Sequence, residues 1–206
     1  MKHFLLFICI FVSLRAADRP HIILIMADDQ GYGDCGITDH PYVKTPNLDA
    51  MSQNSVVFDR FYAGAPVCSP TRASVMTGRN PVRVNVPNHG HYLRPNETTI
   101  AEALKTNGYL TAHFGKWHIG SVQKESPTSP SGQGFEYWLS GLNFFDREPY
   151  LSLNGKFQQF QGQGTVITMD HALAHLKFHS SKQPTFSVIW FPSPHVPHRE
   201  TSSTQG

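Results

Sequence analysis

The 206-residue sequence is poor in charged residues, which make up 16% of it, and it carries little excess of either sign. The formal net charge is +2, and two basic residues near the start, Lys2 and Arg15, account for that excess. A balanced charge gives no basis for binding nucleic acid or an anionic membrane surface. With 39% hydrophobic and 12% aromatic residues, the composition predicts a globular chain and excludes a disordered or collagen-like one.

Long hydrophobic runs and cysteines are also scarce. The longest apolar run, residues 4–14, is shorter than the roughly 20 residues that a bilayer-spanning helix needs, so we expect no stable membrane span. Because a basic residue precedes this run and small residues follow it, residues 1–17 are predicted to be a signal peptide and the protein to be secreted or periplasmic. Of the three cysteines, Cys9 lies inside this run. The two that remain, Cys35 and Cys68, do not make a disulfide framework, although an oxidising compartment would permit them to pair.

Strand-like and helix-like segments alternate along the rest of the chain, without an internal repeat. This alternation predicts an α/β fold with a mostly parallel central sheet and helices on both faces. Residues 121–164 are rich in Ser, Pro, Gly and Gln and are expected to form a long excursion on the surface. The expected strands are residues 22–27, 109–115 and 185–191, with a further β-rich stretch at 56–62.

Helices are expected between these strands, from their capping residues and apolar periodicity. The first is capped by Thr45 and runs to Gln53, the second runs from Pro70 to about Thr77, and the third has Thr99 and Glu102 in capping-box spacing. A fourth is expected at residues 166–178. Its expected buried face holds Ile167, Leu173, Ala174 and Leu176.

Polar residues follow the three predicted strands: Asp28 and Asp29 the first, Lys116 and His118 the second, and His195 the third. Because ligands of open α/β sheets bind beyond the carboxyl ends of the strands, we expect these residues around one pocket. Two adjacent acids form either a turn or a metal site. Both can face one ion only if the backbone turns directly after the strand, and oxygen ligands favour calcium or magnesium over zinc.

The most specific pattern is Cys68-Ser69-Pro70-Thr71-Arg72, which is followed by Thr77-Gly78-Arg79. Here the sequence resembles the formylglycine-dependent, arylsulfatase-like sulfatases of the alkaline phosphatase superfamily, whose motif is Cys or Ser, any residue, Pro, any residue, Arg. The resemblance also covers residues 28–31, 115–118 and 195–198.

The resemblance implies a role for each of these residues. Cys68 would be converted by a formylglycine-generating enzyme into formylglycine, whose hydrate attacks sulfur and then expels sulfate by restoring the aldehyde. Asp28 and Asp29 would ligate Ca²⁺ together with the residue derived from Cys68. Arg72 would steady the diol, Lys116 would bind the sulfate, His118 would take a proton, and His195 would protonate the leaving oxygen.

The leading functional interpretation is hydrolysis of a sulfate ester, on a sulfated sugar, glycan or aryl alcohol. A phosphoester or phosphonate hydrolase on the same scaffold and a non-catalytic sulfated-glycan binder stay open as alternatives. Sulfatases of this kind take further calcium ligands, an Asp-Asn pair, and another lysine from sequence beyond the stretch that ends at His198. No Asp-Asn pair occurs here, so we expect residues 18–206 to be the N-terminal part of a sulfatase catalytic domain, truncated and inactive alone.

The remaining histidines are less informative. His89 and His91 are interpreted as substrate-cleft residues or simply as loop residues. His171, His175 and His179, at four-residue spacing, imitate a metal-binding helix face, but we expect this face to be exposed to solvent and to complete no zinc site.

Overall fold

The computed structural model describes residues 19–144 and 147–197 of the chain. The predicted signal peptide, residues 1–17, and His198 lie outside these residues. No helix in the described part is long and apolar enough to cross a membrane.

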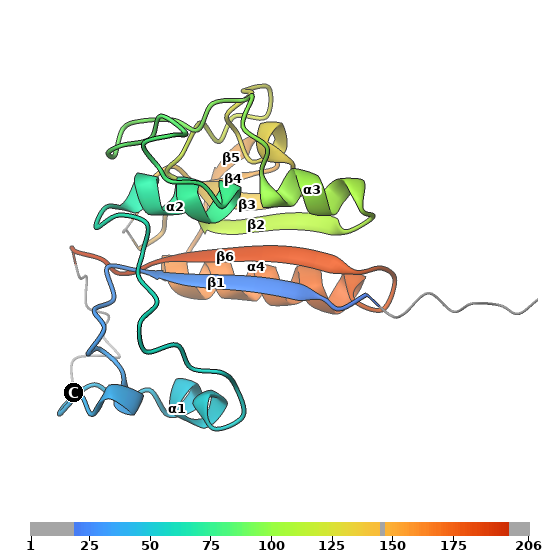
Figure 1. The fold of residues 1–206 in the computed structure, drawn as a ribbon. Helices are drawn as coiled ribbons and strands as arrows, with labels where there is room; N and C mark the ends of the chain where they lie inside the picture. Colours follow the sequence, from blue (N-terminus) through green and yellow to red (C-terminus); the bar gives the residue numbers. More distant parts are fainter. Residues whose placement is uncertain (1–18, 145–146, 198–206) are drawn as a thin grey trace, which may run out of the picture.

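A six-stranded sheet forms the centre of the molecule (Figure 1). The strands are β1 (Ile22–Asp28), β2 (Leu110–Lys116), β3 (Tyr137–Gly141), β4 (Tyr150–Leu153), β5 (Lys156–Gln159) and β6 (Thr185–Pro194). Their spatial order is β1-β6-β2-β3-β4-β5. The first four strands in this order are parallel, whereas β4 and β5 are antiparallel to their neighbours. The predicted α/β class with a mostly parallel sheet is confirmed.

Helices cover both faces of the sheet. The α-helices of the described residues are α1 (Pro46–Ser52), α2 (Cys68–Thr77), α3 (Ile100–Thr106) and α4 (Gly164–His179), of which α2, α3 and α4 pack on the sheet. In Figure 1, α2 and α3 lie above β2, whereas α4 lies behind β6 and β1. Helix α1 lies apart, below β1, on the segment between β1 and α2, which we call the arm. The capping box predicted at Thr99 and Glu102 is present at the start of α3.

Strand β6 supplies side chains to both apolar cores. Phe186 and Trp190 belong to the core under α2 and α3, and Ile189 belongs to the core against α4. A strand that is buried on both faces requires a continuous apolar run, which explains why its sequence lacks alternation.

Two predictions about the chain between the helices are wrong. Residues 56–62 form no strand, and Phe61 is 83% exposed, because β-forming side chains make a strand only where a partner strand and a packing surface are present. Residues 121–164 are not only a surface excursion, since they contain β3, β4 and β5. The aromatic and aliphatic side chains of Trp138 and Leu151 are buried there.

The buried face of α4 also differs from the prediction. Ile167 is buried as expected, but Leu173 and Ala174 are exposed. His175, expected in solvent, is 6% exposed, because its ring packs against Phe114 and Tyr137 at centroid distances of 5.6 and 4.8 Å. On the sheet-facing side of α4, the aromatic contacts of His175 therefore take the place that was predicted for Leu173 and Ala174.

Gly115 lets β2 approach β6 closely. Its φ is +98°, and an added Cβ would lie 2.0 Å from the backbone oxygen of Trp190. Gly115→Ala should therefore lower the free energy of unfolding by about 3 kcal/mol or more, measured by urea unfolding. Gly33→Ala, where a Cβ meets no atom within 4 Å, should change it by less than about 1 kcal/mol. Equal effects would contradict this account of the strand contact.

His175 should make stability depend on pH. Burial, and then the nearby His179, lower the pKa of His175 from 6.5 to about 4. The neutral form thus stabilises the fold above pH 6.5, and this contribution falls as the pH drops from 6.5 towards 4. Between pH 6.5 and 5 we expect a loss of about 1 kcal/mol that His175→Phe removes, measured by urea unfolding. The exposed His91→Phe serves as control, and parallel pH profiles for all three proteins would contradict the prediction.

Candidate active site

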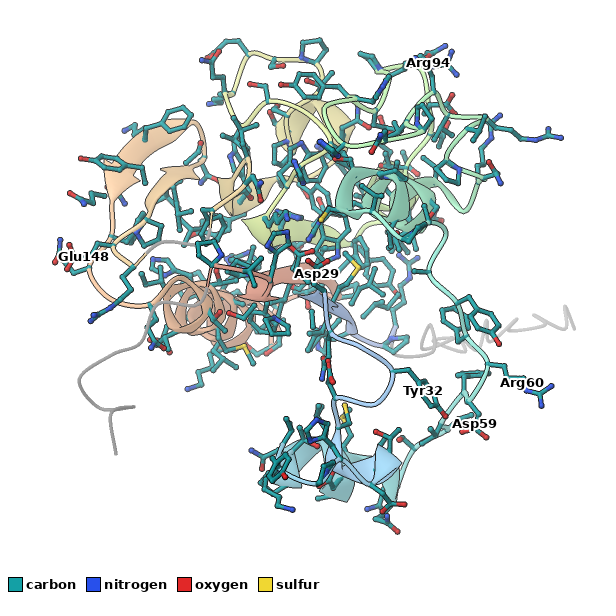
Figure 2. The ribbon with its side chains drawn as sticks, turned by 90° about the vertical axis from the view of Figure 1, so that its left-hand side faces the viewer. Asp29, Tyr32, Asp59, Arg60, Arg94 and Glu148 are labelled. Carbon is teal, nitrogen blue, oxygen red and sulfur yellow. The ribbon has the colours of Figure 1, made fainter. Side chains whose placement is uncertain are left out.

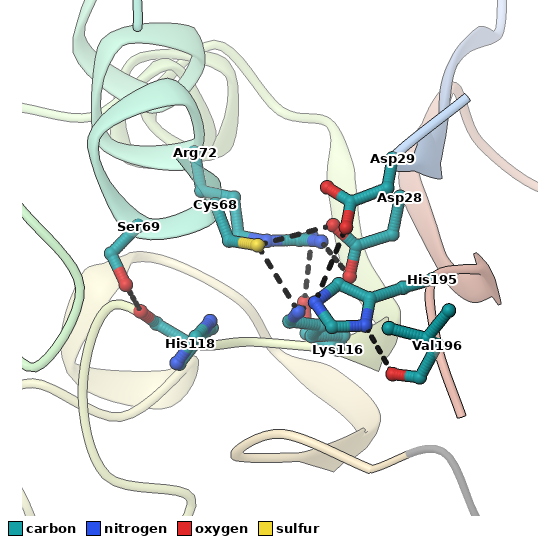
Figure 3. A network of polar contacts seen from close by, with 9 residues as sticks. All are labelled: Asp28, Asp29, Cys68, Ser69, Arg72, Lys116, His118, His195 and Val196. Atoms are coloured by element: carbon teal, nitrogen blue, oxygen red, sulfur yellow. Dashed lines mark hydrogen bonds and ion pairs between the residues drawn. The ribbon is translucent and has the colours of Figure 1, made fainter. Parts of the chain in front are cut away.

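The C-terminal ends of β1, β2 and β6 meet at one edge of the sheet, where α2 begins (at the left in Figure 1). Three parallel strands bring their carboxyl ends to the same edge whatever their separation in sequence. The residues that follow these strands, together with the first turn of α2, therefore face one another (Figure 3).

A backbone turn brings both acids to this edge. The pairing of β1 with β6 is irregular between Met26 and Asp28, and Asp29 has a φ of +62°, a conformation that Asp tolerates better than most residues. The turn thus begins at Asp29 itself, ahead of the glycines at 31 and 33. Asp28 is 4% exposed, whereas the Asp29 side chain is 58% exposed, so the two carboxylates have different environments.

The carboxylate of Asp28 is the centre of a buried cluster. Lys116 Nζ donates to its Oδ2 at 2.5 Å, Arg72 Nη2 lies 3.4 Å from the same oxygen, and Cys68 Sγ lies 3.3 Å from Oδ1. Lys116 Nζ also lies 3.4 Å from Cys68 Sγ. Burial alone would raise the pKa of Asp28, but the Lys116 hydrogen bond and the two positive charges outweigh it and hold this pKa below its ordinary value.

Cys68 is the first residue of α2, earlier than the predicted start at Pro70. Val67 precedes the helix and provides no side-chain cap, so the first backbone N–H groups of α2 have no side-chain acceptor there, and an anion at this helix start would be favoured. Burial raises the pKa of the Cys68 thiol, and Asp28 raises it further against the opposing effect of Lys116. An unmodified Cys68 is therefore a protonated thiol and a poor nucleophile.

Arg72 is held from several sides. Its Nη1 donates to the carbonyl oxygen of Lys116 at 3.0 Å, and its Cζ lies 4.9 Å from the ring centroid of Trp190, a cation–π distance. Burial lowers the pKa of Arg72, while Asp28 counteracts this. The contribution of Trp190 is not evident from the sequence, because this residue lies within a predicted strand and belongs to no motif.

The two site histidines are positioned in different ways. The backbone of His118 has a φ of +54°, and its carbonyl oxygen accepts a hydrogen bond from Ser69 Oγ at 2.6 Å, a contact that the sequence does not indicate. Burial, and then the charges of Lys116 and Arg72, lower the pKa of His118 to about 4. His118 is thus neutral at pH 7 and can accept a proton. His195 Nε2 lies 3.3 Å from Asp29 Oδ2.

The carboxylates of Asp28 and Asp29 could supply some, but not all, of the ligands of a calcium ion. Oxygen atoms of Asp28 and Asp29 are ligands that calcium prefers, but the ion takes about 6 to 8 oxygens, more than two carboxylates offer. One oxygen of Asp28, Cys68 Sγ and a ring nitrogen of His195 lie within 4.8 Å of one another. Asp28, Asp29 and the residue at position 68 would hold the ion, which would supply positive charge to a bound anion.

A pocket of about 330 Å³ opens onto this cluster. Two of its polar lining residues, His89 and Asn143, come from outside the predicted set of site residues. For His89 the sequence leaves a cleft residue and a loop residue open as alternatives, and for Asn143 it gives no signal. The lining residues are Asp29, Pro66, Val67, Cys68, His89, His118, Asn143 and His195.

The chain has the α/β fold of the alkaline phosphatase-like class, with the start of α2 and an acid–lysine–arginine cluster at the carboxyl edge of a mostly parallel sheet. Within that class, the chain belongs to the sulfatase family, whose sequence model matches residues 20–205.

Relatives with curated names include human arylsulfatase A, which is 40% identical over 154 residues, covering 72% of this chain and 30% of the relative. The ulvan-active sulfatase of Formosa agariphila is 31% identical over 185 residues, covering 87% and 36%. The chain thus spans about a third of the length of these relatives. Among solved structures, Ps i-CgsB superposes with a TM-score of 0.82 at 27% identity, covering 90% of this chain and 48% of that one.

Removing the positive charge of Lys116 should leave the buried, negatively charged carboxylate of Asp28 without its nearest cation. Lys116→Met should lower the free energy of unfolding at pH 7 by about 3 kcal/mol, since a buried carboxylate loses its nearest cation. Adding Asp28→Asn should recover much of this loss, and the exposed Lys124→Met serves as control. A loss no larger than that of the control, measured by urea unfolding, would contradict the central role of this ion pair.

Proposed function

We propose that the intact protein hydrolyses sulfate esters. The observation that carries this proposal is the cradle around Cys68: Lys116 and Arg72 place positive charge beside it, and the start of α2 adds backbone N–H groups. A tetrahedral oxyanion held there would have its charge compensated in a largely buried site. Membership of the sulfatase family supports sulfate as that oxyanion.

We further propose that Cys68 is converted to formylglycine by a formylglycine-generating enzyme in an exported protein. When formed, this group supplies a hydroxyl nucleophile and a second hydroxyl whose deprotonation releases sulfate. The raised pKa of the Cys68 thiol supports a modified residue, because the thiol itself is poorly nucleophilic.

We assign a separate role in the reaction to each of the other side chains of the site. Lys116 and Arg72 hold the charged sulfate oxygens, and neutral His118 accepts a proton during sulfate release. His195, at the exposed side of the site beside Asp29, donates a proton to the departing alcohol oxygen. Asp28 keeps Lys116 and Arg72 in place and, with Asp29, would ligate calcium.

The names of the relatives support sulfated sugars or aryl alcohols as substrates. One is an ulvan-active sulfatase and another an arylsulfatase, and Ps i-CgsB has also been solved in complex with k-i-k-neocarrahexaose. Phosphoester or phosphonate hydrolysis stays an alternative, because the same cradle would accept a tetrahedral phosphorus oxyanion.

The proposed activity can be tested on the intact protein made together with the modifying enzyme. Peptide mass spectrometry should find the aldehyde at position 68, and sulfate esters should turn over faster than matched phosphate esters. Cys68→Ala should abolish turnover, Arg72→Ala should reduce kcat about 100-fold or more, and removal of calcium with a chelator should stop the reaction.

Cys35→Ala is the matched control, because Cys35 lies on the arm outside this pocket and its loss should leave turnover unchanged. Full activity with an unmodified thiol at position 68 would refute the mechanism. Faster turnover of the phosphate esters would favour the alternative reaction, and tight sulfated-glycan binding without turnover by the aldehyde form would favour a binding protein.

A further inference from the structure

The pocket above Cys68 has a strongly polar wall. Of its eight lining residues, only Pro66 and Val67 are apolar. No Phe, Tyr or Trp of the described part of the chain lines it. Aromatic or steroid rings bind most favourably against apolar and aromatic walls, so this composition suits a different kind of group.

His89 and Asn143 form the part of this wall that the proposed chemistry leaves unused. His89 lies in the connection between α2 and α3, and Asn143 lies just beyond the end of β3, so two separate segments bring them to the pocket. Both residues are exposed. Their side chains make no hydrogen bond to other residues in the described part, so their donors and acceptors face the pocket and solvent unpaired.

His89 lies close to the reacting groups, because it lines the same pocket as Cys68 and His118. A sulfate held beside Cys68 would therefore present its ester oxygen and the attached alcohol to a space that His89, Asn143 and His195 share. The volume of about 330 Å³ is at the small end of ligand pockets, which suits a compact group.

We propose that His89 and Asn143 are specificity-determining residues that hydrogen-bond hydroxyl groups of the alcohol, so that the site selects a sulfated sugar over an aryl sulfate. This inference rests on the proposed sulfate-ester function. The two kinds of ligand should differ in binding free energy. A sugar hydroxyl can form hydrogen bonds with these polar side chains, whereas a flat apolar ring displaces their water and leaves them without hydrogen bonds.

Binding to a catalytically inert form tests the inference without depending on turnover. The intact protein carrying Cys68→Ala would be titrated calorimetrically with glucose 6-sulfate, galactose 4-sulfate and N-acetylglucosamine 6-sulfate, and with 4-nitrophenyl sulfate. At least one sugar sulfate should bind about tenfold or more tightly than 4-nitrophenyl sulfate. His89→Leu and Asn143→Leu should each weaken that sugar about tenfold and change the aryl sulfate less than about threefold.

His91→Leu provides the matched control, because His91 is exposed two residues away and does not line the pocket. The inference is overturned if 4-nitrophenyl sulfate binds as well as every sugar, or if the His89 and Asn143 variants weaken both ligand types equally. Failure of the aldehyde form to turn over any sulfate ester would instead contradict the proposed function, while the sugar-selective losses would still support the assignment of these two residues.

Discussion

The buried carboxylate of Asp28 is the constraint on which the site depends. It comes from β1, while its compensating cations come from β2 and α2, so one ionic cluster ties together three elements that are far apart in sequence. A buried charge must be paired or it destabilises the fold. The need to pair Asp28 therefore also fixes where Cys68 lies, and the arrangement that stabilises this edge is the one that concentrates positive charge at the first turn of α2.

Strand β6 completes this arrangement from within the sheet. It lies between β1 and β2, contributes Trp190 beneath Arg72, and continues beyond the sheet edge to His195. Gly115 permits the close approach of β2 to β6 at the backbone of Trp190, the residue whose ring contacts the guanidinium. Figure 2, in which Asp29 marks the edge, shows how side chains of the sheet and of α2 converge there, whereas Tyr32, Asp59 and Arg60 lie on the separate arm.

Local patterns predicted much of this structure. The apolar runs of β1, β2 and β6, the capping box of α3 and the motif around Cys68 are each encoded within a few residues, and they account for the parallel sheet and for the residues around Asp28. The prediction failed where distant partners decide the outcome. Strands β3 to β5 form because they pair with one another and with β2, His175 is buried by the rings of Phe114 and Tyr137, and Ser69 reaches His118 only after folding.

The position of β6 in the sheet also sets an order of events during synthesis. Because β6 separates β1 from β2, these two strands cannot be held at their final spacing until the chain has been made through residue 194. Ribosomes add roughly 5 to 20 residues per second, so the segment around Cys68 exists for on the order of ten seconds before its pocket can close. An enzyme that modifies an extended peptide would find Cys68 fully accessible in that interval and only half-exposed beside Asp28 afterwards.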